Sequence, residues 1–268
     1  MSVDPGSIDG GMVIVGAGKA GARAAVALRE EKWDGPITLI GSETLPPYDR
    51  PPLSKSAITD EAAPSPVELL DVATMAALRV TPIFGVAATG IDRASATVLL
   101  ADGRRVSYHR LLLALGANPR PLNCIGGGRS RLLRLFGDAI LLRSQFVEGA
   151  NVVIVGGGFI GLELAASGVA RGAKVTVLEA QPRILMRAVP PEIAAVVDTR
   201  HRDAGVNLRV GVGIAERTET GVICTDGTTI AADIVVAGIG AVPAIRLAEA
   251  SGLAIDNGIA CDSRLATS

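Results

Sequence analysis

At 268 residues the chain is long enough for two domains of ordinary size, and its hydrophobic content of 49% supplies apolar side chains for more than one core. A net charge of −1 gives no general attraction to nucleic acid or acidic membranes, and an aromatic content of 3% argues against base-stacking platforms. No apolar run reaches the ~18 residues that a membrane-spanning helix needs. Composition therefore favours a globular protein that binds neither nucleic acid nor membrane.

The first eleven residues, MSVDPGSIDGG, are polar and rich in glycine. They have neither the basic start nor the apolar centre of a signal peptide. We therefore expect residues 1–11 to form a disordered leader and the protein to be cytoplasmic.

A nucleotide-binding pattern follows this leader directly. An apolar strand at Met12–Val15 leads into a G-x-G-x-x-G turn with Gly16, Gly18 and Gly21. An alanine-rich helix then runs to about Arg29, and a second strand at Ile37–Ile40 is followed by the acid Glu43. In such a unit the first glycine permits a tight turn, the second lets the backbone approach a pyrophosphate, and the third lets the helix pack on the strand. The helix N-terminus faces the phosphates with free N–H groups and a positive dipole end. Glu43 lies 22 positions after Gly21, close to the roughly 20 at which an acid meets the ribose hydroxyls.

The next segment, LPPYDRPPLSK at residues 45–55, contains four prolines. Proline in these numbers excludes a helix or a central strand, so we expect a stiff loop. The loop leaves the carboxyl end of the second strand, where open α/β sheets place ligands. It brings Tyr48, Asp49, Arg50 and Lys55 into that region.

The stretch that follows combines a helix, a strand and a hairpin. Apolar residues recur at helical spacing over 67–78, and residues 80–91 then read as a strand. A hairpin is expected from 96–100 and 106–108, turned at Asp102-Gly103. After a return strand within 110–119, the glycine-rich sequence NCIGGGRSR at 123–131 reads as a linker into a second domain.

The nucleotide-binding pattern then occurs a second time. A strand at Val152–Val155 leads into the glycines Gly156, Gly158 and Gly161. A helix then runs to about Arg171, and a second strand at Val175–Leu178 ends at the acid Glu179. Glu179 lies 18 positions after Gly161. A carboxylate at this point would repel the 2′-phosphate of NADPH, so NADH is the expected ligand. Two dinucleotide folds in one chain imply two dinucleotides brought together so that electrons can pass between them.

The rest of the chain completes the second domain. Val189–Pro191 turns the chain into a helix that ends near Arg202, and Ala232–Gly240 reads as the closing strand. Gly238 and Gly240 would then pass close to the nicotinamide. We expect a leader over 1–11, the first segment of one dinucleotide-binding domain over 12–122, an NAD-binding domain over 123–247 and a return segment to the first domain over 248–268.

Cysteine and histidine show no ligand spacing. The chain contains only Cys124, Cys224, Cys261, His109 and His201 from these two residue types, and the cysteines are far apart in sequence. A disulfide framework, a zinc site and a dithiol redox centre are therefore unsupported, and no metal is expected.

The segment PYDRPPLSK at 47–55 makes a family resemblance specific. The chain resembles the putidaredoxin reductase-like family of FAD-dependent NADH:ferredoxin and rubredoxin reductases, which serve ring-hydroxylating dioxygenases and bacterial cytochromes P450. In that family the segment occupies the place where disulfide-reducing relatives carry a redox cysteine pair. The resemblance covers nearly all of this chain, and HRDAGV at 201–206 matches a further family segment. It implies an α/β fold of glutathione-reductase type with two Rossmann-like domains. The first, which begins with the segment over 12–122, would bind FAD and is expected to be discontinuous and incomplete.

The resemblance also implies roles for polar residues near the flavin. The residues that match Lys55 and Arg50 lie against the flavin in the family, and the one that matches Glu163 pairs with the lysine. Lys55 and Glu163 are therefore the candidate catalytic pair, which would tune the flavin. The family arginine at the position of Arg134 reaches back to FAD.

Other cofactor contacts follow from the same resemblance. An acid at one of the positions matching Ser42 and Glu43 binds the adenosine ribose of FAD, and because the first is serine here, Glu43 must serve. The backbone near Ala88 would contact adenine, and the family keeps an arginine with NADH at the position of Arg183. The turn residues Ala20 and Ile160 are counted with the glycines as cofactor-binding.

This chain departs from the family text at two threonines. The family reads L-L-x-A-T-G-x-x-P where this chain has Leu115, and L-R-T-x-x-D-A where it has Leu135. Each leucine removes a hydroxyl near the cofactor. Family members also continue into an A-x-G-D motif, whose aspartate binds FAD, and a C-terminal interface domain, whereas this sequence stops at Ser268. We expect the FAD fold to lack one strand and to leave an unpaired edge.

The leading hypothesis is an NADH-dependent flavoprotein reductase of aromatic-degradation or P450 systems, with FAD and NADH as cofactors and a [2Fe–2S] ferredoxin or a rubredoxin as acceptor. One alternative is a non-catalytic NAD(H)-binding remnant. Another is the NADH-oxidising part of a nitrite reductase, whereas a peroxide-reducing flavoenzyme would need a cysteine that is missing here. The sequence leaves the particular acceptor and the oligomeric state open.

Overall fold

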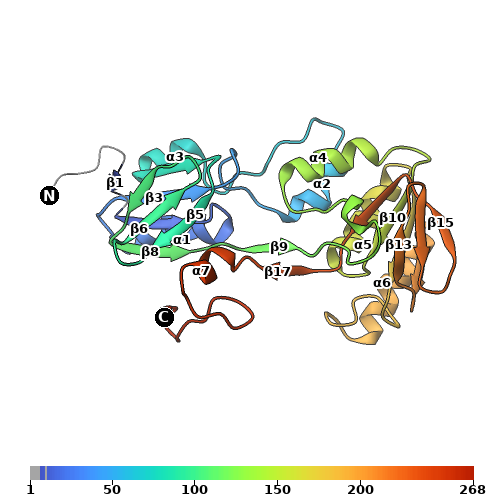
Figure 1. The fold of residues 1–268 in the computed structure, drawn as a ribbon. Coiled ribbons are helices and arrows are strands. Elements are labelled where there is room, and N and C mark those ends of the chain that lie inside the picture. Colours follow the sequence, from blue (N-terminus) through green and yellow to red (C-terminus); the bar gives the residue numbers. More distant parts are fainter. Residues whose placement is uncertain (1–6, 10) are drawn as a thin grey trace. The chain divides into compact units, whose positions relative to one another are not determined.

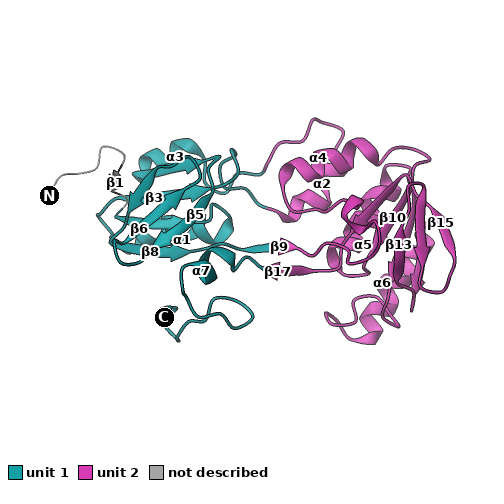
Figure 2. Cartoon of the chain, viewed as in Figure 1, with its two compact units in different colours: residues 1–49, 67–117, 243–268 teal, residues 50–66, 118–242 magenta. Residues whose placement is uncertain are grey.

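The computed structural model describes residues 7–9 and 11–268 of the chain. These fold into two compact units, each assembled from separate stretches of sequence (Figure 2). Unit 1 comprises residues 1–49, 67–117 and 243–268, and unit 2 comprises residues 50–66 and 118–242. Among the described helices, none is long and apolar enough to cross a membrane.

Unit 1 is built on a parallel sheet with strand order β4-β3-β2-β8. Two of these strands, β3 and β8, are labelled in Figure 1. Its strands are β2 (Met12–Val15), β3 (Ile37–Gly41), β4 (Val80–Phe84) and β8 (Arg110–Leu113). The helices α1 (Lys19–Glu30) and α3 (Val72–Ala77) connect parallel neighbours, as such crossovers require. β3 is buried along its whole length, which explains why its sequence is apolar rather than alternating.

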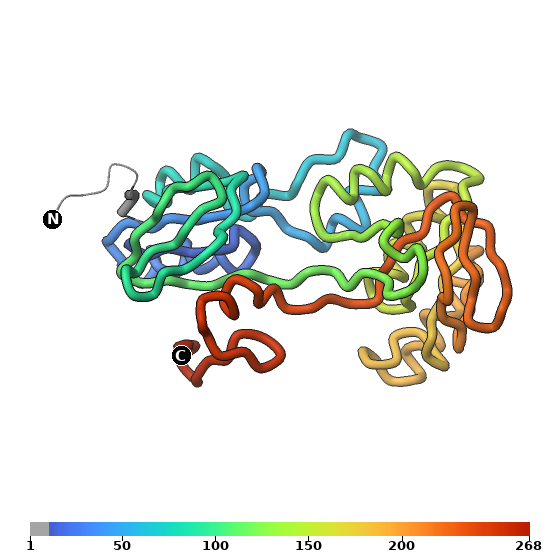
Figure 3. The backbone as a smooth tube through the Cα atoms, viewed as in Figure 1, coloured from blue at the N-terminus to red at the C-terminus, as the bar shows by residue number. Residues whose placement is uncertain are grey.

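A smaller, mainly antiparallel sheet completes unit 1. It contains β5 (Ala88–Asp92), β6 (Thr97–Leu100), β7 (Arg105–Ser107) and β1 (Ser7–Asp9), the last parallel to β7. The C-terminal helix α7 (Arg246–Ala250) lies against β5, and Figure 3 follows the chain from there to its red end. Of the expected disordered leader, residues 1–6 and 10 lie outside the described residues, whereas 7–9 form a strand.

Unit 2 repeats the parallel arrangement with strand order β12-β11-β10-β16. Its strands are β10 (Asn151–Val155), β11 (Lys174–Glu179), β12 (Asn207–Val210) and β16 (Ile234–Ala237). Its longer helices are α4 (Phe136–Gln145), α5 (Phe159–Ala170) and α6 (Pro191–Asp203). The β-branched residues of β10 and β16 are almost completely buried, so this sheet forms the centre of unit 2.

A three-stranded antiparallel sheet packs its apolar side chains with those of β10 and β16. It contains β13 (Ile214–Arg217), β14 (Gly221–Cys224) and β15 (Thr229–Ala231). The short strands β9 (Ala117–Pro119) and β17 (Ala241–Pro243) form a separate two-stranded sheet.

The glycine-rich stretch 123–131 is more ordered than a linker. It contains the 3₁₀ helix η2 (Gly127–Arg129), and Gly127 is buried. A Cβ on Gly126 would lie 2.0 Å from the Arg217 carbonyl oxygen, so the stretch packs tightly on β13. Its glycines serve close packing as well as flexibility.

The proline-rich segment contains one short helix where a loop was expected, and a second short helix begins directly after it. They are η1 (Pro51–Ser54) and α2 (Ser56–Thr59). Pro51 and Pro52 stand at the first positions of η1, where the missing N–H groups cost nothing. Prolines therefore initiate this helix instead of preventing it.

Two other segments form shorter elements than their apolar patterns predict. The run expected as one strand over 80–91 is split between β4 and β5, with Gly85 at a φ of 77° between them. The helix expected over 67–78 begins only after Asp71, whose carboxylate accepts the Thr74 N–H at 2.6 Å and caps α3. This hydrogen bond holds the pKa of Asp71 below its usual value.

Candidate dinucleotide sites

At two positions in the glycine turn of unit 1, a side chain would collide with the surrounding backbone. Gly16 has a φ of 119°, and a Cβ there would lie 2.1 Å from the Ala114 carbonyl oxygen. A Cβ on Gly21 would lie 1.9 Å from the Gly16 carbonyl oxygen. Gly18 is different, because its backbone is extended and a Cβ would meet nothing within 4 Å. The space beside Gly18 is therefore open.

The turn of unit 2 has the same three properties. A Cβ on Gly156, whose φ is 114°, would lie 2.5 Å from the Gly238 carbonyl oxygen, and one on Gly161 would lie 2.0 Å from the Gly156 carbonyl oxygen. A Cβ on Gly158 would again meet nothing within 4 Å. Gly238 contributes only its backbone carbonyl to this contact, because a Cβ on Gly238 itself would lie 3.4 Å from the Gly161 Cα, an ordinary contact distance. Its approach to a nicotinamide, and that of Gly240, stay predictions.

Both turns lead into helices of 12 residues whose N-termini carry no side-chain cap. The first N–H groups of such helices need acceptors, and a pyrophosphate supplies them. Ala20 of α1 is exposed, as are Phe159 and Ile160 of α5, at 57% and 49%. Exposed apolar side chains beside uncapped amides suit a ligand that is both anionic and aromatic.

The acid of unit 2 is held by backbone amides. Glu179 at the end of β11 accepts the Gly157 N–H at 2.7 Å and the Gln181 N–H at 2.8 Å. A Cβ on Gly157 would approach the Glu179 Cβ to 3.1 Å, so the glycine leaves room for this carboxylate. The half-buried Glu179 is therefore fixed beside the glycine turn.

The acid of unit 1 has a different position and partner. In the strand register the counterpart of Glu179 is Gly41, so Glu43 follows two residues later. Its carboxylate accepts the Tyr48 hydroxyl at 2.5 Å, while Ser42 is exposed. The sequence indicated Tyr48 only as a loop residue, and nothing in its spacing revealed this contact.

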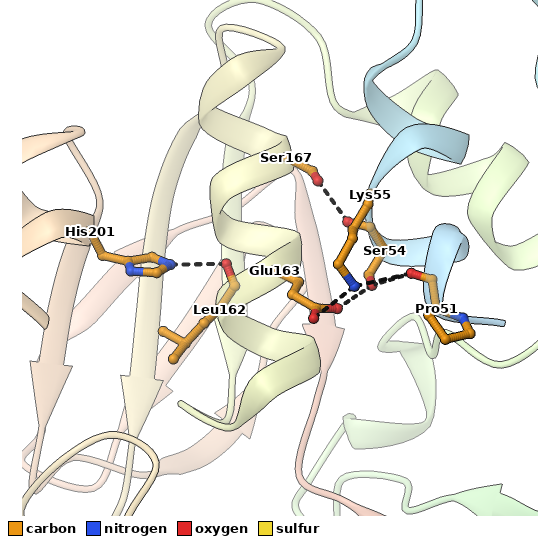
Figure 4. A network of polar contacts seen from close by, with 7 residues as sticks. All are labelled: Pro51, Ser54, Lys55, Leu162, Glu163, Ser167 and His201. Carbon is orange, nitrogen blue, oxygen red and sulfur yellow. Dashed lines mark hydrogen bonds and ion pairs between the residues drawn. The ribbon is translucent and has the colours of Figure 1, made fainter. Parts of the chain in front are cut away.

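Unit 2 brings the candidate catalytic pair together (Figure 4). Lys55 Nζ lies 2.8 Å from Glu163 Oε1, which is the pairing expected from the family resemblance. The other carboxylate oxygen, Oε2, accepts the Ser54 hydroxyl at 2.5 Å. Lys55 Nζ also donates to the Pro51 carbonyl oxygen at 3.2 Å. Ser54 was missed from the sequence because serine beside a candidate lysine carries no spacing signal.

Two of the three arginines assigned to cofactors, Arg50 and Arg183, donate to backbone carbonyl oxygens. Arg50 donates to the Arg134 carbonyl oxygen at 2.6 Å, which brings these two residues together in unit 2. Arg183 donates to carbonyl oxygens of the loop after β11, those of Ile184, Leu185, Met186 and Val189. Ala88 lies in β5 of unit 1, paired with Leu100. Contacts of these four residues with a nucleotide stay predictions.

No group of histidine, cysteine, aspartate and glutamate side chains suited to a metal occurs in the described part of the chain. The three cysteines are free thiols, of which Cys224 is buried in the unit 2 core, Cys124 is half-buried and Cys261 is exposed.

Two parallel sheets, each with a glycine turn, an uncapped helix and a nearby acid, define a protein with two dinucleotide-binding folds in one chain. The comparison with known families agrees. The chain belongs to the pyridine nucleotide-disulphide oxidoreductase family, whose model matches residues 11–268.

Its relatives within this family include electron-transfer reductases. It is 39% identical to putidaredoxin reductase CamA of Pseudomonas putida, over 96% of this chain and 64% of that protein. It is 38% identical to a rubredoxin-NAD(+) reductase of the same species, over 96% of this chain and 69% of that protein. The chain thus spans just under two thirds of the length of putidaredoxin reductase.

Solved structures give the same result. The crystal structure of the ferredoxin reductase for the CYP199A2 system from Rhodopseudomonas palustris matches 97% of this chain with a TM-score of 0.92 and 36% identity, over 66% of its own length. The reductase in a covalent putidaredoxin reductase–putidaredoxin complex matches 97% of this chain with a TM-score of 0.91, over 65% of its own length. The expected fold class of two Rossmann-like domains, the first discontinuous, is confirmed.

Proposed function

We propose that this chain forms the dinucleotide-binding part of an NADH-dependent flavoprotein reductase. It would take electrons from NADH through FAD and pass them singly to a [2Fe–2S] ferredoxin or a rubredoxin in the cytoplasm, serving a dioxygenase or a cytochrome P450. The observation that carries the proposal is the open space beside Gly18 and Gly158, where the fold itself has no need of glycine. A pyrophosphate that must lie close to the protein backbone would explain a glycine at both positions.

The residues present suit FAD in unit 1. Its pyrophosphate would lie at the N-terminus of α1 beside Gly18, and the Glu43 carboxylate would accept hydroxyls of the ribose. Tyr48 holds that carboxylate by a hydrogen bond, so its orientation is set before a ligand arrives. When bound, FAD supplies the exchange between a two-electron donor and one-electron carriers.

The residues of unit 2 suit NADH better than NADPH. Glu179 is fixed beside the glycine turn by two N–H groups, and a carboxylate there would bind ribose hydroxyls and repel a 2′-phosphate. Arg183 lies nearby in sequence, but its guanidinium donates to backbone carbonyls. The cation that NADPH would need is therefore engaged elsewhere.

The chain's own contribution to the reaction would be orientation and electrostatics. The Lys55 ammonium, paired with Glu163, would stabilise negative charge that develops on a reduced cofactor ring. No acid or base needs to move a proton for hydride transfer itself. Sequences related to this one are named for putidaredoxin, rubredoxin and ferredoxin, which supports a small acceptor protein of that kind.

A visible absorption spectrum of the purified protein with FAD, before and after anaerobic NADH, tests the proposal. We expect a flavin band that NADH bleaches and that NADPH bleaches far more slowly, followed by reduction of an added [2Fe–2S] ferredoxin. A protein that stays colourless with added FAD but binds NADH in calorimetry would instead support a non-catalytic NAD(H)-binding protein.

A further inference from the structure

We propose that Ser54 is a positioning residue that holds Glu163 in its ion pair with Lys55. It does so by donating its hydroxyl to the carboxylate oxygen that Lys55 leaves unoccupied. The inference rests on the proposed function only for its consequence at the flavin, because the contacts themselves lie within unit 2.

The ion pair alone is a weak restraint. The side chains of Lys55 and Glu163 are 51% and 32% exposed, and water competes with both charges. A long lysine side chain in such a pair keeps much of its rotational freedom. Something further is needed to hold the ammonium at one point.

Ser54 supplies that restraint from a buried position. The residue is 4% exposed, and its hydroxyl oxygen lies 2.5 Å from Glu163 Oε2, a distance typical of a strong bond to a charged acceptor. With Oε2 bonded to Ser54, Oε1 is the oxygen that faces Lys55. The carboxylate cannot rotate to exchange its two oxygens without breaking this part-buried hydrogen bond.

The backbone that carries Ser54 is itself fastened to α5. Ser167, four residues after Glu163 and on the same helix face, donates its hydroxyl to the Ser54 carbonyl oxygen at 2.6 Å (Figure 4). On the other side of the helix, His201 Nε2 of α6 lies 3.1 Å from the Leu162 carbonyl oxygen. The helix turn that bears Glu163 is thus held from two directions.

A closed set of contacts results. Lys55 Nζ contacts both Glu163 Oε1 and the Pro51 carbonyl oxygen, and the Ser54 hydroxyl contacts Glu163 Oε2 with the same Pro51 oxygen 3.5 Å away. At 2.5 Å against 3.5 Å, the hydroxyl hydrogen belongs to the carboxylate. Ser54 therefore acts on Lys55 through Glu163 and not merely as a cap of its own helix.

Chemical labelling of lysine in the protein without cofactors tests this directly. Acylation of Lys55 by an amine-reactive ester is followed by mass spectrometry, with Lys19, Lys32 and Lys174 as internal references. We expect Ser54→Ala to raise the labelling rate of Lys55 several-fold and Ser54→Thr to restore the rate of the unchanged protein. The reference lysines should react as before in both variants.

Two further variants separate positioning from general loosening. Ser167→Ala removes a different buried hydroxyl, the one on the Ser54 carbonyl oxygen, and leaves the bond from the Ser54 hydroxyl to Glu163 in place. We therefore expect a lower melting temperature with Lys55 labelling near that of the unchanged protein. In a Glu163→Gln background, Ser54→Ala should raise the labelling no further. Equal labelling in the two serine variants, or an undiminished effect of Ser54→Ala beside Glu163→Gln, would overturn the proposal.

The flavin-loaded protein gives the second readout. We expect Ser54→Ala to lower the kcat for NADH-dependent flavin reduction several-fold while leaving KM for NADH unchanged, since Ser54 touches no part of the proposed NADH site. If the protein proves not to bind FAD, the proposed function fails while the labelling result still decides the role of Ser54. Unchanged labelling in a protein that does turn over would remove only this inference.

Discussion

The glycines of each turn divide into those that the fold needs and one that only a ligand would need. In unit 2 the fold needs Gly156 and Gly161, whose Cβ atoms would collide with backbone oxygens, while Gly158 has open space beside it. The same division holds in unit 1 for Gly16 and Gly21 against Gly18. Stability and binding should therefore respond to different glycines of the same motif.

We expect Gly161→Ala to destabilise unit 2 by about 1–3 kcal/mol, because the new Cβ forces helix and turn apart. Gly158→Ala should leave the free energy of unfolding nearly unchanged and weaken NADH binding at least several-fold. Urea unfolding and calorimetric titration with NADH measure the two effects. Gly18→Ala is the matched control, since it should spare NADH binding and weaken FAD binding. A Gly158→Ala protein that binds NADH normally would contradict the ligand explanation.

Some residues of the candidate sites could be predicted from the sequence, and others could not. The positions of the glycines and acids follow from local spacing, and the pairing of Lys55 with Glu163 followed from family resemblance. The hydroxyl of Ser54 on Glu163 and that of Tyr48 on Glu43 could not be predicted. Serine and tyrosine hydroxyls accept many partners, so only the folded backbone determines which one they meet.

At the scale of elements, a single arginine connects the ends of two helices in unit 1. The Arg29 guanidinium at the end of α1 donates to the Leu78 carbonyl oxygen at 2.6 Å and the Arg79 carbonyl oxygen at 3.0 Å, both just after α3. It also donates to the carbonyl oxygens of Trp33 and Gly35 in the loop between α1 and β3. Burial lowers the pKa of Arg29 below its usual value, with Arg79 nearby adding to the effect.

Replacing this arginine should loosen both helix ends. We expect Arg29→Met, which keeps the apolar stem, to lower the free energy of unfolding of unit 1 by about 1.5–3 kcal/mol, the range for hydrogen bonds to a charged group. Arg23→Met is the control, because Arg23 forms only an exposed pair with Glu30 and should cost about 0.5 kcal/mol or less. Chemical denaturation of both variants decides the matter, and similar losses would refute a special role for Arg29.

The element boundaries show where sequence patterns suffice. The strands β2, β3, β10 and β11 and the helices α1, α5 and α6 were predicted within a few residues, because β-branched runs and apolar periodicity act locally. The helix η1 was missed because prolines were taken only as helix breakers. The division of 80–91 depends on Gly85, where the chain leaves one sheet for another, and such a choice is made by tertiary pairing.

At the scale of the whole molecule, each unit has its own parallel sheet and its own buried cluster. Residues such as Ile14 and Leu39 form the centre of unit 1, and Val153 and Val235 that of unit 2. Each unit also has its own glycine turn and acid. The two cofactors proposed above should therefore stabilise different parts of the chain.

Amide hydrogen exchange followed by mass spectrometry can show which part of the chain each cofactor stabilises. We expect NADH alone to slow exchange most at 156–161 and around Glu179, because its phosphates would accept the N–H groups of that turn. FAD alone should slow exchange most at 16–21 and around Glu43. The reverse pattern, or equal protection of both turns by NADH, would show that the cofactors are assigned to the wrong units.

The division into units has a consequence for hybrid proteins. Residues 50–66 belong by contact to unit 2, although they follow the acid of unit 1 in sequence. A chimaera that exchanges only residues 123–247 between two relatives would join Glu163 of one parent to Ser54 and Lys55 of the other. Crossover points that preserve the cluster must transfer two separate gene fragments together, so functional recombinants should be found mainly among those whose 50–66 and 118–242 share one ancestry.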